Sequence, residues 1–345
     1  MNINIKSMEL DIKQIAERFS NDINFFKNKT FFITGATGFF GLWLLSVLVE
    51  LNNIYKCNMR IFALSRDPSI FIKKNPQFKN HIFFIKGDIR SFILDDINID
   101  YCFHMATTNA HETFKNEDQL NKIDLLYNGT KNLMQQLTNT DIKKIIFTSS
   151  GVVYGALDSQ DHFSEDSFTA PSTIDVSSAL AEGKRLAEYI ISYYCKSNQI
   201  PFNIARCFSF VGQNLPLDIH YAVGNFINDA VNNDEIIIKG TGKDIRSYLF
   251  AGDAITWLLK MLITPNYNQI YNVGSGRQIS IKSLAELVGR LISPNKNIVL
   301  ENKLKQNDNF MRSIYVPNID KIRKDLGVEE WTSIEDAIIK TASSL

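Results

Sequence analysis

The sequence predicts an α/β fold in which a doubly wound parallel sheet is followed by a smaller C-terminal lobe. From residue 28 onward, short apolar runs alternate with helical stretches. The apolar runs are nearly continuous, which is typical of parallel strands buried on both faces. Beyond about residue 210 this alternation loosens, and loops such as GQNLPLD and KGTGKDIRSY interrupt it. We therefore expect residues 28–210 to form the sheet domain, completed by a helix near 250–264, and residues 211–345 to form mainly the smaller lobe.

Each element follows from its local pattern. Residues 1–27 precede the first strand, and an extra amphipathic helix is expected at 8–27. The expected strands are apolar and bounded by polar or glycine residues, at 29–35, 60–66, 81–88, 99–107, 143–150 and 202–212. The expected helices between them lie at 39–52, 119–137 and 177–189.

Composition narrows the classes of protein that fit. The 345 residues are 45% hydrophobic and 21% charged, with 37 basic and 37 acidic side chains. A net charge near zero gives no field that would attract nucleic acid or an anionic membrane, so a small molecule is the expected partner. Four widely spaced cysteines without a CxxC pair argue against zinc and a disulfide framework, and no metal site is expected. No apolar leader or run of 18 apolar residues is present, and a cytoplasmic location is expected.

The stretch FFITGATGFFGLW places Gly35, Gly38 and Gly41 directly after a strand and at the start of a helix. Glycines at this spacing allow a tight turn, the approach of a pyrophosphate to the backbone, and close packing of helix on strand. The strand–turn–helix context favours a dinucleotide site over an ordinary glycine-rich turn.

The ends of the next two strands bear on the choice of dinucleotide. The second strand ends in Ser65 and Arg66, and a guanidinium suits the 2′-phosphate of NADP. Asp67 follows and is able to supply the carboxylate that binds the ribose of NAD. NADP is slightly preferred on this pattern, with NAD as the alternative. Asp88 and Ile89 end the third strand where an adenine edge would lie, unless Asp88 only caps a turn.

Together these motifs resemble the extended short-chain dehydrogenase/reductase family, in particular its nucleotide-sugar epimerases and dehydratases. The resemblance also rests on GDIR, FHMAT, FTSSGVVYG, EGKRLAE, ARCFSFVG, GTGKDIRSYLFAGD and YNVGSG, which occur in the family's order. It implies a Rossmann domain with a C-terminal lobe that binds a sugar nucleotide. It also implies chemistry that begins with hydride transfer from a sugar carbon, often C4, to NAD(P).

The resemblance assigns roles to individual positions. Ser150 matches the residue that hydrogen-bonds the reacting hydroxyl, unless it only caps the following turn. Lys184 matches the lysine that binds the nicotinamide ribose and lowers the pKa of a catalytic tyrosine, the alternative being a solvated helix lysine. The positions expected to bind cofactor are Gly35, Thr37, Gly38, Phe39, Phe40, Gly41, Ser65, Arg66, Asp88, Ile89, Met105, Ala106, Thr107, Lys184 and Cys207. The positions expected to bind substrate are Thr108, Ser150, Asn225, Arg246 and Arg312, the two arginines as diphosphate ligands unless they are ordinary surface residues.

Two departures from the family pattern qualify the expected chemistry. The family's 4,6-dehydratases carry acidic residues directly after the position of Ser150, and its decarboxylases keep a Glu there. Here these positions are Gly151 and Val152, which cannot transfer a proton. This favours 4-epimerisation, or oxidation and reduction at C4, over a dehydratase with atypical acids.

The second departure is Leu180, which stands four residues before Lys184, where the catalytic tyrosine is expected. Leucine cannot donate, accept or ionise, so the chain is expected to bind its ligands and turn over poorly. Tyr154 is a possible replacement, whereas Tyr189 points to another face of the helix. Three explanations are open: an engineered substitution, a natural enzyme that moves the proton by another route, or a non-catalytic binding relative. The resemblance further implies a homodimer formed through a four-helix bundle that includes the Lys184 helix.

Overall fold

The structure is a computed structural model, and it describes residues 8–107, 118–155, 162–217, 221–301 and 314–345. Its centre is a seven-stranded parallel sheet in the order β11-β6-β5-β4-β1-β2-β3. The strands are β1 (Thr30–Thr34), β2 (Arg60–Ser65), β3 (Phe83–Lys86), β4 (Tyr101–His104), β5 (Lys144–Ser150), β6 (Phe202–Cys207) and β11 (Gln269–Val273). The strand order reverses between β1 and β4, and ligands of doubly wound sheets bind at such a reversal.

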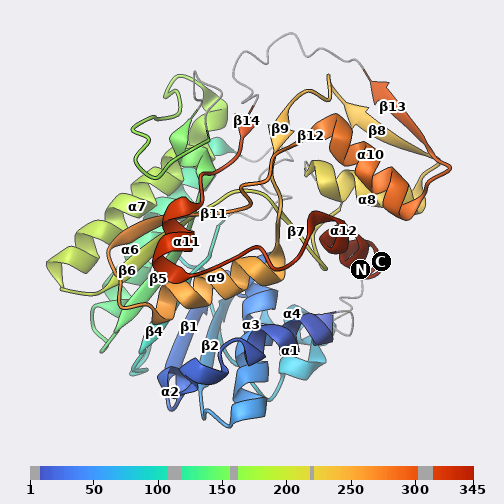
Figure 1. The fold of residues 1–345 in the computed structure, drawn as a ribbon. Coiled ribbons are helices and arrows are strands. Elements are labelled where there is room, and N and C mark those ends of the chain that lie inside the picture. Colours follow the sequence, from blue (N-terminus) through green and yellow to red (C-terminus); the bar gives the residue numbers. More distant parts are fainter. Residues whose placement is uncertain (1–7, 108–117, 156–161, 218–220, 302–313) are drawn as a thin grey trace.

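Helices cover both faces of this sheet, which confirms the predicted α/β fold (Figure 1). One face packs against α3 (Phe39–Tyr55) and α9 (Ala251–Ile263), and the other against α6 (Gln119–Leu137) and α7 (Ala179–Ser197). Helix α1 (Glu9–Glu17) packs on α3 and α9. The side chains of β1 alternate between these two cores, with Phe31 and Ile33 on the α3 side and Phe32 on the α6 side. A strand buried on both faces needs a continuous apolar run, and for this reason the strand could be predicted from the sequence. Helix α4 (Pro68–Lys74) follows β2.

The N-terminal stretch differs from the single helix expected at 8–27. It is divided into α1, a 3₁₀ turn at Ser20–Asp22 and α2 (Ile23–Phe26). The turn has the sequence Ser-Asn-Asp, whose side chains compete with helical hydrogen bonding. On either side of it Phe19 and Phe26 are fully buried and meet edge to edge at 6.0 Å between ring centroids. The break in the helix lets both rings reach the core.

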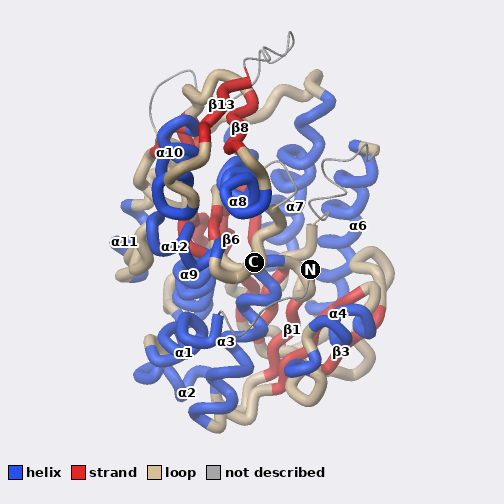
Figure 2. Tube along the Cα trace, turned by 90° about the vertical axis from the view of Figure 1, so that its right-hand side faces the viewer, coloured by secondary structure: helices blue, strands red, loops and turns tan. Residues whose placement is uncertain are grey.

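The C-terminal lobe is built from small sheets and short helices, part of which is seen at the top of Figure 2. Its elements are β7 (Phe210–Val211), α8 (Ala222–Asn232), β8 (Glu235–Lys239), β9 (Ile245–Arg246), β10 (Leu249–Phe250), β12 (Ile279–Ser280), α10 (Ile281–Ile292), β13 (Asn297–Glu301), β14 (Ile314–Tyr315), α11 (Asp320–Leu326) and α12 (Ile334–Ala342). Three segments beyond residue 210 belong to the Rossmann-type domain or pack on it. These are helix α9, which was expected near 250–264, strand β11, which pairs with β6 and was not expected, and α11, which packs against β11 and α9. None of the helices in the described ranges is long and apolar enough to cross a membrane.

Candidate active site

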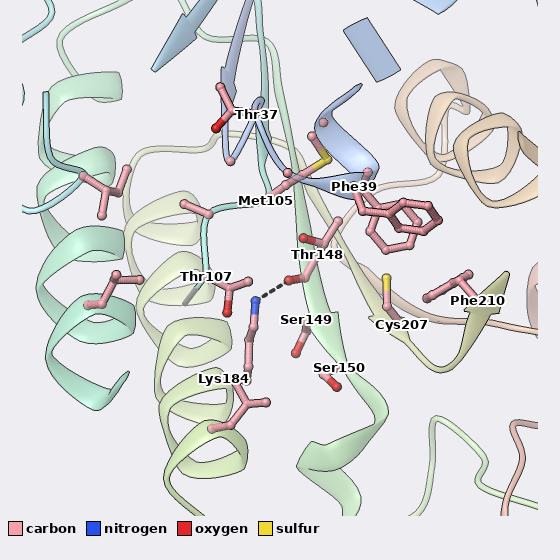
Figure 3. A pocket seen from close by; sticks show the side chains of 18 of the residues that line it. Thr37, Phe39, Met105, Thr107, Thr148, Ser149, Ser150, Lys184, Cys207 and Phe210 are labelled. Carbon is pink, nitrogen blue, oxygen red and sulfur yellow. Dashed lines mark hydrogen bonds between the residues drawn. The ribbon is translucent and has the colours of Figure 1, made fainter. Parts of the chain in front are cut away.

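A cavity of about 580 Å³ opens at the carboxyl ends of the strands, where the strand order reverses. Its lining includes every residue expected to bind cofactor, together with Ser150 and Leu180. These residues come from seven different parts of the chain, and Figure 3 shows the side chains of some of them around one space. Residues more than 100 positions apart in the sequence therefore lie around the same cavity.

The glycine loop has almost no room for side chains at two positions. Gly35 has a φ of +69°, and a Cβ there would lie 2.5 Å from the Met105 carbonyl group. A Cβ on Gly41 would lie 2.3 Å from the carbonyl group of Ala36. These contacts explain why the turn between β1 and α3 requires glycine.

The start of α3 is suited to a phosphate group. Gly38 is its N-cap and contributes no side-chain hydrogen bond, and the first-turn residues Phe39, Phe40 and Gly41 line the cavity. N–H groups in the first turn of a helix lack acceptors within the helix, and the helix dipole favours negative charge there. A Cβ on Gly38 would meet only the carbonyl oxygen of Gly35, at 3.4 Å, so this position leaves the cavity open. The residues present fit the pyrophosphate of a dinucleotide.

The end of β2 places Ser65 and Arg66, but not Asp67, in the cavity lining. Asp67 instead caps α4, where its Oδ1 accepts hydrogen bonds from the Ser69 hydroxyl and from the Ile70 N–H at 3.1 Å. These hydrogen bonds hold the pKa of Asp67 below its usual value. Its carboxylate is thus already used within the protein.

Asp88 lines the cavity and also closes a turn. Its Oδ1 accepts a 2.9 Å hydrogen bond from the Arg90 N–H, and its carboxylate pairs with the Arg90 guanidinium at 2.8 Å. That pairing lowers the pKa of Asp88. Asp88 therefore caps a turn, as the alternative interpretation expected. Because it also lines the cavity, the geometry is compatible with a role in cofactor binding as well.

Lys184 projects from α7 into the cavity and donates a 2.7 Å hydrogen bond to the Thr148 carbonyl at the end of β5 (Figure 3). Its side chain is 4% exposed, so the alternative of a solvated surface lysine does not fit. Burial lowers its pKa to about 8, which allows it to exchange a proton near neutral pH. Cys207, across the cavity, has its pKa raised to about 12 by burial and stays a thiol.

Leu180 lies one helical turn before Lys184 on α7, half-buried, and its side chain lines the same cavity. Residues at i and i+4 on a helix are neighbours, about 5–6 Å apart at Cβ. A tyrosine at position 180 would therefore place its hydroxyl in this space, close to the lysine ammonium. Leucine offers only an apolar surface there.

Tyr154 does not replace the missing phenol in this arrangement. It is 1% exposed, outside the cavity lining, and donates a 2.8 Å hydrogen bond to the Asn272 side-chain oxygen. The Arg206 guanidinium lies 4.6 Å from its ring centroid. Burial raises its pKa to about 12, which makes it a poor proton acceptor near neutral pH.

Ser150 lines the cavity, and its hydroxyl also accepts a 3.3 Å hydrogen bond from the Val152 N–H at the start of a 3₁₀ turn. The next residue, Gly151, has no space for a side chain. A Cβ there would lie 2.7 Å from the Tyr315 hydroxyl and 2.7 Å from the tip of the Phe208 ring. An acid at 151 would therefore require the Phe208 and Tyr315 rings to shift.

Two residues expected to bind substrate lie outside this lining. Asn225 is on α8, and Arg246 is on β9, where its Nη1 donates a 2.8 Å hydrogen bond to the Ile245 carbonyl and its Nη2 lies 3.9 Å from Asp244. Thr108 and Arg312 fall outside the described residues. The substrate-binding roles of all four stay predictions.

Sequence reasoning missed part of the cavity lining. The missed residues come from the β6–α8 segment and from α6 and are mostly apolar: Leu125, Phe208, Ser209, Phe210, Leu215, Pro216 and Tyr221. Apolar loop residues carry no recognisable signal in a single sequence. Within the described ranges, no group of three or more His, Cys, Asp or Glu side chains is placed to hold a metal ion.

A doubly wound parallel sheet with a glycine loop, a buried lysine and a strand-end serine around one cavity defines a dinucleotide-dependent enzyme. Residues 31–274 match the NAD dependent epimerase/dehydratase family. The chain belongs to this family. The description names NAD, and the slight sequence-based preference for NADP is not supported by it.

Relatives and solved structures agree with this assignment. UDP-glucuronic acid decarboxylase 2 of Arabidopsis thaliana is 25% identical over 308 residues, 89% of this chain and 66% of that protein. The dTDP-D-glucose 4,6-dehydratase of Dictyostelium discoideum is 28% identical over 275 residues, 74% of this chain and 60% of that protein. The chain thus spans less than two thirds of the length of these two curated relatives. The fold of UDP-glucuronic acid 4-epimerase from Bacillus cereus, solved with UDP-glucuronic acid and NAD, superposes with a TM-score of 0.77 at 19% identity, covering 91% of this chain and 98% of that one.

Proposed function

We propose that this chain transfers a hydride between a carbon of a nucleotide-bound sugar, most simply C4, and a tightly bound nicotinamide dinucleotide. One observation carries the proposal: the glycine loop, Ser150 and Lys184 line a single cavity at the strand-order reversal. The cofactor, when bound, accepts and returns the hydride. The named relatives act on UDP- and dTDP-sugars, which supports the same substrate class here.

The roles of the residues follow from their positions. Lys184, held by the Thr148 carbonyl, binds the nicotinamide ribose and can exchange a proton near neutral pH because burial lowers its pKa to about 8. Ser150 hydrogen-bonds the sugar hydroxyl that loses or gains the proton. Asn225, Arg246, Thr108 and Arg312 remain proposed ligands of the sugar nucleotide.

The reaction proposed is epimerisation, or interconversion of alcohol and ketone, without elimination. Loss of water from the sugar needs a second acid–base group beside the serine. Gly151 and Val152 supply none, and a side chain at position 151 would require Tyr315 and Phe208 to shift. A dehydratase that uses atypical acids is therefore the less favoured enzyme.

We propose NAD as the cofactor, in place of the NADP suggested by Ser65 and Arg66. The family description and the NAD in the Bacillus cereus 4-epimerase structure support NAD. Because Asp67 caps α4, we expect the ribose hydroxyls to be bound by Ser65 and the backbone at the end of β2 rather than by that carboxylate.

The experiment that tests the function is a substrate panel. Purified protein with NAD is incubated with UDP-, GDP-, CDP- and dTDP-sugars, and products are followed by NMR, for the chain as it stands and for Leu180→Tyr. Slow turnover by the chain and faster turnover by the variant support the proposal. If neither version converts any sugar nucleotide, the enzymatic function is wrong, and a 4-keto-6-deoxy product would contradict the argument from Gly151.

A second candidate is a non-catalytic protein that binds NAD and a sugar nucleotide, and Leu180 favours it. Calorimetry would then show binding of both ligands with no product from either the chain or the variant.

A cytoplasmic location is also proposed, supported by four cysteines that are all free.

A homodimer is proposed as the functional unit. Helices α6 and α7 lie side by side, and they expose Leu120, Tyr127, Tyr189 and Tyr193 to solvent. Apolar and aromatic side chains of this kind are enriched at protein interfaces. Light scattering coupled to gel filtration measures the mass.

A further inference from the structure

The N-terminal helix α1 lies against α3 and carries a buried carboxylate, Asp11, that is 6% exposed. Its Oδ2 accepts a 3.0 Å hydrogen bond from the Gln213 side-chain amide. Its Oδ1 pairs with the Lys340 ammonium of α12. One carboxylate thus joins the first helix, the last helix and the segment that follows β7.

The segment that Asp11 holds is a wall of the cavity. Gln213 is 1% exposed, and its carbonyl accepts a 3.2 Å hydrogen bond from the Trp43 indole N–H on α3, the helix that begins at the glycine loop. Two and three residues further on, Leu215 and Pro216 line the cavity. The position of this wall therefore depends on a contact with α1.

The contact is costly to disturb because the Asp11 carboxylate is buried, its side chain being 7% exposed, while the side chain of Lys340 is 35% exposed. A buried carboxylate needs both a cationic partner and hydrogen-bond donors, and losing one partner leaves the other unpaired. Lys340 also lies 5.7 Å from the centroid of the Phe250 ring, which meets the Trp43 ring edge-on at 5.4 Å. The same cluster of side chains therefore connects the two lobes beside the start of α3.

We propose that Asp11 is a positioning residue for the cofactor site: through Gln213 it fixes the Leu215–Pro216 wall, so that α1 contributes to cofactor binding without touching the cofactor. This inference rests on the proposed function, in which the cavity binds NAD.

The test compares Asp11→Asn with Asp22→Asn in the full-length chain. Asp22 serves as a control for the loss of a carboxylate–lysine pair away from the cavity, because its Oδ2 pairs with Lys260 of α9 at 2.9 Å and neither residue lines the cavity. It is more exposed than Asp11, so a smaller loss of Tm is expected for it. Calorimetry measures the Kd for NAD, and thermal unfolding measures Tm. We expect both variants to lower Tm, and only Asp11→Asn to raise the Kd, by about 2- to 30-fold. Gln213→Leu, which removes the bond from its other end and keeps the Asp11–Lys340 pair, should raise the Kd in the same way.

Hydrogen exchange of residues 212–217 gives an independent readout. Exchange there should be faster in Asp11→Asn and Gln213→Leu than in the wild type, and unchanged in Asp22→Asn. Equal effects of Asp11→Asn and Asp22→Asn on the Kd and on exchange, or no effect of either, would overturn the inference. If the wild type binds no NAD, the proposed function fails, and hydrogen exchange alone then decides whether Asp11 holds the wall.

Discussion

Replacing Leu180 with tyrosine should supply the phenol that the family resemblance places at this position. Leu180 is half-buried, lines the cavity and stands one helical turn from Lys184. A tyrosine ring attached there extends into the cavity rather than into the core. Its hydroxyl would then lie near the lysine ammonium and near the strand end that carries Ser150.

The expected gain follows from general acid–base catalysis, which contributes about 10²- to 10⁴-fold in rate. A neighbouring cation lowers the pKa of a phenol by about 1–3 units from about 10. Lys184 has a pKa of about 8, so it is still largely protonated below that pH. We therefore expect kcat of Leu180→Tyr to exceed that of the wild type about 10²- to 10⁴-fold and to rise between about pH 7 and 8.

Leu180→Phe is the matched control, since it adds the ring without the hydroxyl. The assay is turnover of the best sugar nucleotide from the panel, with kcat measured for all three proteins from pH 6 to pH 9. Equal rates for the tyrosine and phenylalanine variants would refute the reasoning. So would a tyrosine variant that binds both ligands and is no faster than the wild type.

Two further predictions concern Gly151 and Lys184. Gly151→Ala should lower the free energy of unfolding by about 1–3 kcal/mol through overpacking against Tyr315 and Phe208. Adding Tyr315→Ala to this variant should recover part of the loss. If denaturant unfolding shows that the effects of the two substitutions simply add, the contact between these residues is contradicted. Lys184 has a pKa of about 8 in the folded chain, below its value of about 10.4 in the unfolded chain. Between these pH values the unfolded chain binds more protons than the folded chain. The cost of burying the charged lysine, about 3 kcal/mol, therefore disappears as the pH rises. The stability of Lys184→Met relative to wild type should therefore fall by about that amount between pH 8 and pH 10.5, and a difference independent of pH would show that the lysine is not buried as described.

The sheet domain was predictable because burial on both faces imposes a pattern on the sequence. Phe31, Phe32 and Ile33 are all fully buried, and only a central parallel strand requires such a run. Strand β11 was missed because Gln269–Val273 mixes polar and apolar residues at the edge of the sheet. The break in the N-terminal stretch was missed because it depends on where Phe19 and Phe26 find space in the core.

The residues of the site likewise include some that could be predicted from the sequence and some that could not. Glycines and a lysine at fixed spacing from strand ends were recognisable, since backbone geometry and charge limit which residues serve there. Leu215 and Pro216 were not, because an apolar loop residue looks the same in a cavity wall and in a core. The close packing around Gly151 could not be predicted either, because Tyr315 lies 164 positions further along the chain. Contacts of that range depend on tertiary packing rather than on local pattern.

The central claim is hydride transfer from a sugar carbon to the nicotinamide, and isotope transfer measures it most directly. Leu180→Tyr with bound NAD is mixed with one equivalent of a sugar nucleotide deuterated at C4, denatured within one turnover, and the released cofactor is analysed by mass spectrometry. The account predicts a reduced cofactor that carries one deuterium. The experiment is repeated with deuterium placed in turn at each ring carbon of the sugar. If the sugar nucleotide is converted and the cofactor stays unlabelled in every case, the account is wrong.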